Sequence, residues 1–185
     1  MTLPIRTGDW TLDQAHTTVG FTVRHLGISR VRGRFTGVEA TVHVGPDLPS
    51  TTVRVEVELA TVNTDNPDRD AHLRSSDFFS IESHPMMVFE SGSIEEHGQD
   101  RYRIDGHLHL NGRVKPLALD VDFLGTATFP GDGSVHAGFT ATGSLSRKAF
   151  GVDFNVPLAA GGFVIADQVN IEIDVQLLPA VAQAA

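Results

Sequence analysis

Apolar and polar residues alternate with a period of two over most of this chain, which is typical of β-strands that bury one face. Residues 52–60 show the pattern most clearly, because valine and leucine alternate there with arginine and glutamate. Similar alternation runs through residues 17–25, 31–35, 38–44, 87–94, 101–110, 115–124, 135–145 and 169–177. Asn111-Gly112, between two of these runs, is a strong hairpin signal. The pattern predicts about eight long antiparallel strands.

One stretch, residues 66–85, departs from this alternation. Asn66 can cap a helix, and Pro67 suits the first helical position because it lacks an N–H and has a fixed φ. Asp68 and Asp70 place negative charge at the positive end of the helix dipole. The apolar positions that follow are Ala71, Leu73, Phe78 and Phe79. We therefore expect a helical insertion near residues 66–80 that covers the mouth or flank of the strands.

Amphipathic strands of this number and length can form a two-sheet sandwich or a closed barrel. A sandwich fills its interior with side chains, whereas an eight-stranded barrel removes its edges and can hold one small ligand. The predicted inner face mixes small residues with phenylalanines, which suits a curved, tapering pocket. We predict an all-β, eight-stranded antiparallel barrel that encloses a lipid-like ligand. The alternative is a dry, filled core, as in a module that only contacts other proteins.

Alternation assigns the lumen to one face of each strand and to the apolar edge of the insertion. The predicted lumen residues are Val19, Phe21, Val23, Phe35, Val53, Val55, Val57, Leu73, Phe78, Phe79, Phe89, Leu108, Leu119, Phe139, Ala141 and Phe150. A lipid site needs only a few polar groups, placed to hold a head group near its mouth. The candidates are Arg69, Asp70, His72 and Arg147. Alternatively, Arg69 forms a structural ion pair with Asp70 or Asp153.

Composition narrows the class of partner. The chain has 185 residues, 41% of them hydrophobic, which is enough for one domain over residues 1–185 with a sizeable core. A formal net charge of −9 argues against nucleic-acid binding, which requires a basic surface. There is no cysteine and no apolar run of transmembrane length. The N-terminal MTLPIRTGDW lacks the apolar run of a signal peptide, so we expect a cytoplasmic protein that does not span a membrane.

The nine histidines raise the alternative of a small metal-dependent enzyme. His107 and His109 lie two residues apart on one predicted strand and therefore share a face. His43 and His136 occupy the corresponding polar faces of their own strands. By parity all of these face solvent, whereas a catalytic metal is expected in a concave, dry site. Nucleophile elbows and phosphate-binding loops are also absent from the sequence. We therefore expect no metal, no cofactor and no catalytic residues.

Four segments carry a family resemblance. They are HTTVGFTVRHLGISRVRGRF (16–35), RDAHLRSSDFFSIESHPMMVFES (69–91), GHLHLNGRVKPLALDV (106–121) and SRKAFGVDF (146–154), and together they resemble the YceI-like family in order and spacing. The resemblance implies a lipocalin-like barrel with a helical insertion. Its lumen would hold a polyisoprenoid, an isoprenoid quinone or a fatty-acid derivative for storage or transport, without catalysis. The resemblance also makes a homodimer an expectation. Many members of the family are secreted to the periplasm behind a signal peptide, and this chain departs from that pattern.

Overall fold

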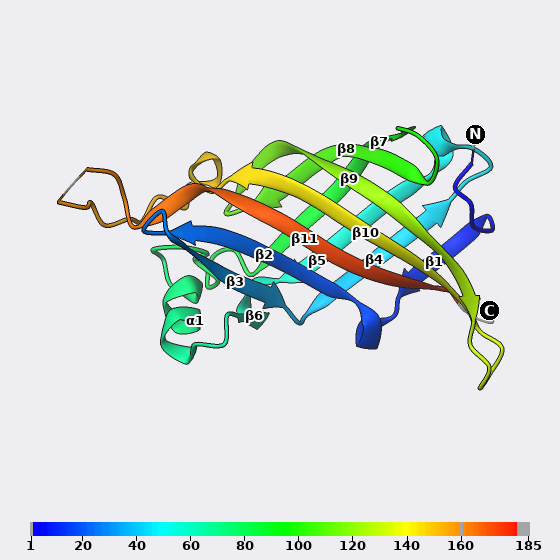
Figure 1. Ribbon diagram of the computed structural model, residues 1–185, viewed down its shortest axis with the longest axis horizontal. Helices are drawn as coiled ribbons and strands as arrows, with labels where there is room; N and C mark the ends of the chain where they lie inside the picture. The colour runs from blue at the N-terminus through cyan, green and yellow to red at the C-terminus, as the bar shows by residue number, and fades with distance from the viewer. Residues whose placement is uncertain (1, 160, 181–185) are drawn as a thin grey trace.

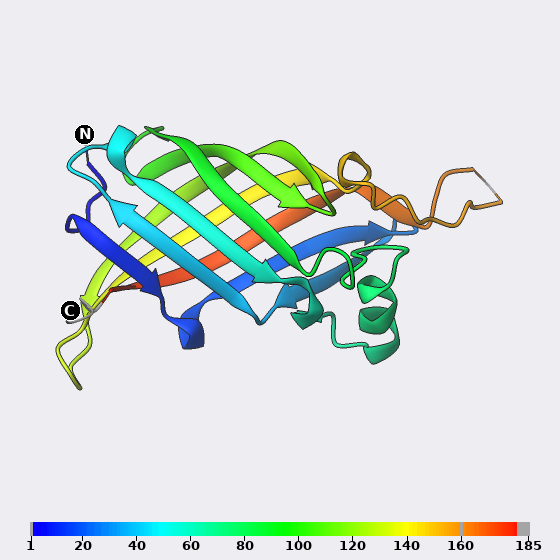
Figure 2. The same ribbon diagram turned by 180° about the vertical axis from the view of Figure 1, so that it is seen from behind.

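An antiparallel barrel forms the body of the protein in a computed structural model, which describes residues 2–159 and 161–180 (Figures 1 and 2). The strands are β1 (Gly8–Leu12), β2 (Thr18–His25), β3 (Ser29–Phe35), β4 (Val38–Val44), β5 (Thr52–Glu58), β6 (Val62–Asn63), β7 (Met86–Glu96), β8 (Arg101–Leu110), β9 (Arg113–Thr128), β10 (Val135–Ser146) and β11 (Ile165–Pro179). The helices are α1 (Pro67–Arg74) and the 3-10 turns η1 (Gln14–His16), η2 (Leu48–Ser50), η3 (Leu59–Thr61) and η4 (Lys148–Phe150).

Eight strands close the barrel in the order β1, β4, β5, β7, β8, β9, β10 and β11, with β11 pairing back to β1. The fold predicted from the alternation is therefore confirmed. The long strand β11 closes it by sharing one edge between two partners. Its C-terminal end pairs with β1, through Leu177 opposite Leu12, and its earlier part pairs with β2, through Ile173 opposite Val19. The β2–β3 hairpin therefore continues the wall beyond β1 and β4.

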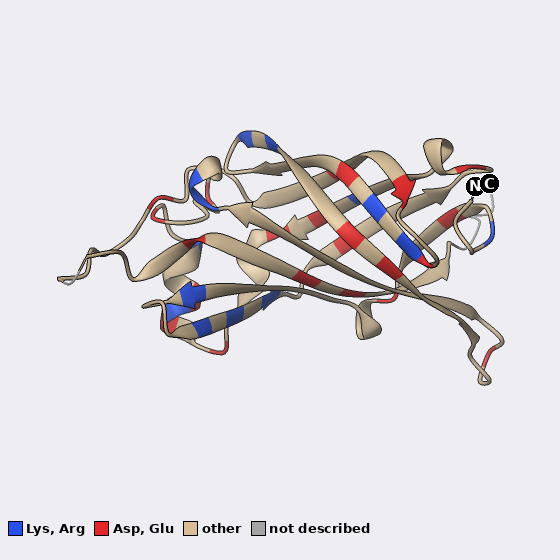
Figure 3. Cartoon of the chain, turned by 45° about the horizontal axis from the view of Figure 1, so that its top comes forward, with Lys and Arg blue, Asp and Glu red and all other residues tan. Residues whose placement is uncertain are grey.

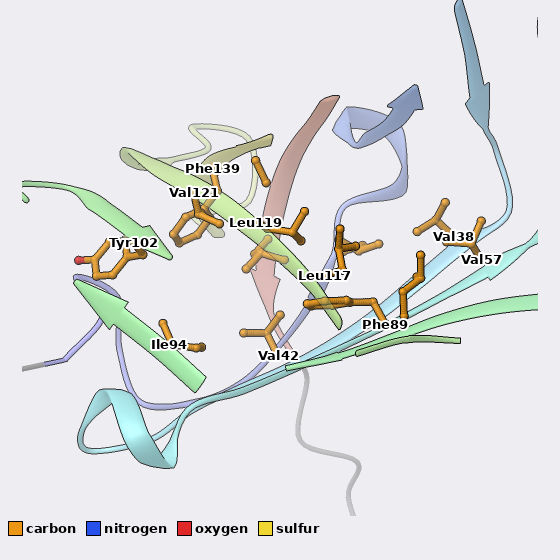
Figure 4. Packing of buried hydrophobic residues seen from close by; sticks show 14 of the residues in the cluster. Val38, Val42, Val57, Phe89, Ile94, Tyr102, Leu117, Leu119, Val121 and Phe139 are labelled. Carbon is orange, nitrogen blue, oxygen red and sulfur yellow. The ribbon is translucent and has the colours of Figure 1, made fainter. Parts of the chain in front are cut away.

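The interior is built from the apolar positions of the alternation. On β5, Val53, Val55 and Val57 face inward and lie opposite the inward residues of β4 and β7. Figure 4 shows buried side chains from several strands projecting toward one another, among them Val42, Phe89, Leu119 and Phe139. Trp10 on β1 is one of the most deeply buried residues. The sequence analysis did not predict β1, because this strand has only five residues and only two large apolar ones, Trp10 and Leu12, which give a weak strand signal.

The insertion between β6 and β7 lies at one end of the barrel, and the N-terminus lies at the other (Figure 1). Its helix begins as predicted, since the Asn66 side chain accepts a hydrogen bond from the Arg69 amide at 2.9 Å. The helix is shorter than predicted, however, and ends at Arg74. Ser75 takes an extended conformation and its hydroxyl donates to the carbonyl of His72 at 2.7 Å, which competes with continued helix.

Residues 75–85 then form turns that bring two aromatic side chains back to the barrel. Phe79 N donates to the carbonyl of Leu73 at 3.0 Å, and the carbonyl of Phe78 accepts from the Asn111 side chain at 2.8 Å. Pro85 is tied to the end of β5 through a hydrogen bond from Leu59 N at 2.9 Å. The insertion is thus fastened to β5 and to the β8–β9 turn, across the end of the barrel.

Candidate ligand-binding cavity

The barrel encloses one continuous cavity of about 680 Å³, lined by side chains from every strand of the closed barrel and from β2, β3 and α1. Leu3 and Leu12 line it near the N-terminal end, and Leu73 lines it near α1. This volume falls within the ordinary range for sites that bury a small ligand. All predicted lumen residues except Phe150 line it: Val19, Phe21, Val23, Phe35, Val53, Val55, Val57, Leu73, Phe78, Phe79, Phe89, Leu108, Leu119, Phe139 and Ala141.

Phe150 was predicted to face the lumen and instead lies outside the cavity lining. Strand β10 ends at Ser146, so the period-two rule no longer applies four residues later. Phe150 belongs to η4, where the chain turns, and its side chain is buried in the core with 2% exposure. Its role is packing beside the cavity rather than forming the cavity wall.

Aromatic rings are concentrated in the part of the cavity near α1. The rings of Phe21 and Phe35 lie 5.6 Å apart, and Phe79 from the insertion lies 6.0 Å from Phe35. On the other side, Phe78 lies 5.3 Å from Phe154 of the segment after η4. These pairs join the wall, the insertion and the segment after η4 into one apolar surface.

The basic residues that line the cavity all lie near α1. Arg24 and His25 come from the end of β2, Arg69 and His72 from α1, and Arg147 from the residue that follows β10. No Asp or Glu of the described residues lines the cavity, although the chain has 23 Asp and Glu residues and 14 Lys and Arg residues. The arrangement can hold an electron-rich or anionic group at this end and an apolar chain along the rest.

Arg69 is held by Thr64 rather than by a carboxylate. Its Nε and Nη2 donate to the hydroxyl and the carbonyl of Thr64, both at 2.7 Å. The predicted alternative, an ion pair with Asp70 or Asp153, does not occur among the described residues. Asp70 does not line the cavity. It is buried behind it, where its Oδ1 accepts from the amide of Thr64 at 2.9 Å and from the hydroxyl at 2.6 Å.

Arg147 is buried, with 5% exposure, yet its guanidinium is satisfied by backbone oxygens. It donates to the carbonyls of Val152, Phe154, Ile165 and Ala166 at 2.6 to 3.3 Å. Burial lowers the pKa of Arg147, and the nearby carboxylates of Asp167 and Asp153 oppose that change. The side chain therefore ties the segment after η4 to the start of β11 and leaves a positive charge against the cavity.

The cavity reaches the surface beside α1. Three residues that line it are also exposed to solvent, namely Arg24 at the end of β2, Ser29 at the start of β3 and His72 on α1. At the N-terminal end the corresponding residues, Leu3 and Leu12, are buried. We call the region around Arg24, Ser29 and His72 the mouth of the cavity.

Sequence reasoning missed several lining residues. Tyr102 lines the cavity toward the N-terminal end, and burial raises its pKa, with smaller contributions from Glu96 and Asp100. Its place among Ile104, Leu108 and Leu110 on one face of β8 could have identified it, because alternation already groups these residues. Phe154 had no such signal, since it lies in no strand and enters the lining only because Arg147 holds its carbonyl.

The histidines considered for a metal site lie on the outside of the barrel. His109 Nε2 lies 3.3 Å from Glu90 Oε2, and His43 Nδ1 lies 2.7 Å from Asp9 Oδ1. His107 is exposed, and His136 lies near Asp13 at 3.6 Å. Within residues 2–159 and 161–180 there is no group of three or more His, Asp or Glu placed to hold a metal ion. In the same residues, none of the helices has the length and apolar character needed to cross a membrane.

Comparison with known proteins gives consistent matches. The YceI-like domain matches residues 10–177. A UPF0312 protein of Staphylococcus aureus is 31% identical over 165 residues, which cover 89% of this chain and 94% of that protein. The crystal structure of the Campylobacter jejuni YCEI protein is 31% identical, with a TM-score of 0.72, covering 92% of this chain and 97% of that one. A polyisoprenoid binding domain from Saccharophagus degradans has a TM-score of 0.63 at 13% identity over 95% of this chain and all of that one, a likeness of fold alone.

Proposed function

Since this chain belongs to the YceI-like family, we propose that its barrel binds one amphipathic lipid without covalent chemistry, for storage or transport. The ligand class is an isoprenoid, an isoprenoid quinone or a fatty-acid derivative. The observation that carries the proposal is the continuous apolar cavity whose basic residues all lie at the end that carries α1. The polyisoprenoid binding domain of S. degradans, which shares the fold, supports the same ligand class.

The energetics of such a cavity favour a branched or linear hydrocarbon chain. Burying one methylene is worth about 0.8 kcal/mol, so a five-carbon isoprene unit gains roughly 3 kcal/mol before the cost of ordering it. Micromolar binding corresponds to about 8 kcal/mol, so a few units are sufficient. A cavity of this size argues against an interaction module with a filled interior, because the interior of such a protein is close-packed.

The head group of the ligand would lie at the mouth, and the chain would extend toward Tyr102 and Leu12. Arg69 is the group best placed to meet a phosphate, carboxylate or quinone oxygen, because the Nε2 atom of His72 already lies 2.8 Å from Asp77 Oδ2. Arg69 uses Nε and Nη2 on Thr64, which fixes the guanidinium while Nη1 has no partner among the described residues. Arg147 contributes its positive charge, since its donors are directed to backbone carbonyls.

The test is mass spectrometry of an organic extract from protein purified without detergent. We expect a stoichiometric amphiphile from the unaltered chain and a much smaller amount from Phe139→Arg and Val55→Asp, which place charge in the cavity. Ala141→Phe fills the same space without a charge, so it tests occupancy if the charged variants fold poorly. Thr142→Arg is the matched control, because Thr142 is exposed on the outer face of β10, the strand that carries Phe139 and Ala141.

Two outcomes would overturn the proposal. One is a native extract without lipid together with failure to take up added geranylgeraniol and palmitate. The other is equal lipid content in the cavity variants and the Thr142→Arg control, which would place the bound lipid outside the barrel.

A further inference from the structure

Four exposed arginines gather on the β2–β3 hairpin, in a chain whose net charge is −9. Arg24 and Arg30 are direct partners in the register of the two strands, and Arg32 and Arg34 follow on alternate positions of β3. All four side chains are exposed. Figure 3 shows this basic strip on one edge of the barrel, at the end that carries α1, while acidic residues are frequent on other strands. We call these four residues the arginine strip.

The arginine strip is poorly neutralised by the protein itself. Of its four members, only Arg34 lies within ion-pair distance of a carboxylate in the described chain, at 3.7 Å from Asp65, and that pair is exposed. Like charges placed directly opposite each other on neighbouring strands destabilise a sheet. The Arg24–Arg30 pair therefore has a cost that an anionic partner would remove.

Exposed apolar residues lie next to the strip. Ile28 at the tip of the hairpin is 83% exposed and Leu26 is 40% exposed. Phe163 and Val156, in the segment before β11, are exposed to 55% and 48%. A hydrogen bond from Leu26 N to the carbonyl of Val164, at 2.8 Å, fastens the hairpin tip to this segment. We call Leu26, Ile28, Val156 and Phe163 the apolar tip.

The backbone conformation at the tip of the hairpin is strained for Leu26. Leu26 has a φ of 54° and Gly27 a φ of 73°, and they are the central residues of a turn closed by the hydrogen bond from Ile28 N to the carbonyl of His25, so the φ values match those of a type I′ turn. Such turns prefer Asn-Gly, because a leucine is strained at positive φ. The turn therefore presents an apolar side chain to solvent at a position where a polar residue would be more stable.

The arginine strip and the apolar tip meet at the mouth of the cavity, since Arg24, His25 and Ser29 belong to the same hairpin and line the cavity. We propose that this end of the barrel docks on an anionic lipid bilayer, with the arginine strip on phosphate groups and the apolar tip among the head groups. Basic residues flanking exposed apolar side chains are the combination that such surfaces bind. A nucleic acid or an acidic protein would use the arginines but would not require the apolar tip.

Docking in this orientation presents the mouth to the membrane. A lipid could then pass between bilayer and cavity without crossing water. This last step rests on the proposed function, whereas docking itself does not. The two are tested separately, because vesicle binding can be measured on protein with an empty or blocked cavity.

The experiment is co-sedimentation of the full chain with vesicles of phosphatidylcholine, with and without phosphatidylglycerol. We expect several-fold stronger binding to the anionic vesicles, weakening as salt is raised. The variant Arg24→Gln/Arg30→Gln/Arg32→Gln should lose roughly tenfold or more of this binding, since each basic residue contributes near an anionic surface. Its matched control is Arg54→Gln/Arg101→Gln/Arg103→Gln, which changes the net charge equally on other strands and should bind as the unaltered chain does.

The apolar tip has its own variant, Leu26→Asn/Ile28→Ser. Asparagine suits the type I′ turn, so this protein should remain folded and be at least as stable, yet its vesicle binding should fall several-fold. Phe139→Arg, which blocks the cavity, should dock normally while losing its lipid. Equal sedimentation of the arginine variant and its control would overturn the proposal. A second result would also overturn it: vesicle binding by the tip variant that is undiminished, together with binding of the unaltered chain to heparin or DNA that is as strong as its binding to vesicles. That result would assign the arginine strip to a soluble polyanion.

Discussion

The ring of Phe21 on β2 lies across Gly33, its register partner on β3, so closely that a Cβ atom on Gly33 would come within 2.3 Å of Phe21 Cζ. The same Cβ would lie 2.9 Å from Thr64 Cγ2. The missing side chain of Gly33 therefore leaves room for the Phe21 ring, which contacts Phe35 and forms part of the cavity wall. An aromatic side chain that covers a glycine on the neighbouring strand also shields the exposed backbone there.

Replacing Gly33 by alanine should displace the Phe21 ring toward the cavity. Because the clash is mainly with the far end of a side chain, the barrel should stay folded while the cavity narrows. Forcing extra atoms into packed space costs about 1–3 kcal/mol of free energy. A ligand bound in the narrowed cavity meets a cost of this kind, so we expect its affinity, measured with a fluorescent fatty-acid or isoprenoid probe, to fall roughly tenfold. Gly92→Ala is the control, since Gly92 is exposed and its Cβ would only reach ordinary contact at 3.4 Å. Unchanged probe affinity in Gly33→Ala would contradict this account of the wall.

Asp70→Ala should loosen the insertion that covers the end of the barrel. The buried carboxylate accepts two hydrogen bonds from Thr64, and their loss should lower the free energy of unfolding by about 1–3 kcal/mol. Because Arg69 is held by the same threonine, release of bound probe should also become faster. Asp68→Ala is the matched control in the same helical turn, exposed and expected to cost no more than about 1 kcal/mol. Chemical denaturation and stopped-flow release measure the two effects, and equal values for both variants would refute the role of Asp70.

Arg147→Met should destabilise the protein strongly, because four backbone carbonyls lose their donor in a buried setting. We expect a loss of about 3 kcal/mol or more in the free energy of unfolding. Lys148→Met, at the next position, is exposed and lies 5.2 Å from the Phe163 ring, and it should lose less than about 1 kcal/mol. Thermal unfolding of the two variants measures the difference. Similar melting temperatures would mean that Arg147 is not needed to hold the segment between η4 and β11 in place.

Tyr102 is the single tyrosine of the chain, so its ionisation can be followed by ultraviolet absorbance without interference. Burial raises its pKa above the ordinary value of 10.0, since the phenolate is less well solvated inside the barrel. The folded state thus holds this proton more tightly than the unfolded state does. Its contribution to stability is complete below the ordinary pKa and is lost as the pH rises through the raised one. Coincident titration midpoints in native buffer and in denaturant would disprove the buried placement.

Local patterns in the sequence were sufficient for the longer strands and for the two faces of each, although not for the short strands β1 and β6. Side chains on successive residues of a strand must point to opposite sides, so the valines of β5 could be assigned to the interior before any partner strand was known. The start of α1 was equally local, because the Asn66 cap and Pro67 act within one turn. The end of α1 was less predictable, because the Ser75 hydroxyl that competes with the helix is only a weak signal in the sequence.

What the sequence by itself determined is therefore the alternation, the polarity of each face and the acidic total charge. The tertiary structure decided which strands share an edge, such as β1 and β2 along β11, because pairing depends on contacts between residues more than a hundred positions apart. It also decided that the interior is a cavity rather than a filled core, since packing depends on how far a closed barrel holds its walls apart. Arg24, Arg69 and Arg147 line the same cavity for the same reason, because only closure of the barrel brings their three distant segments together.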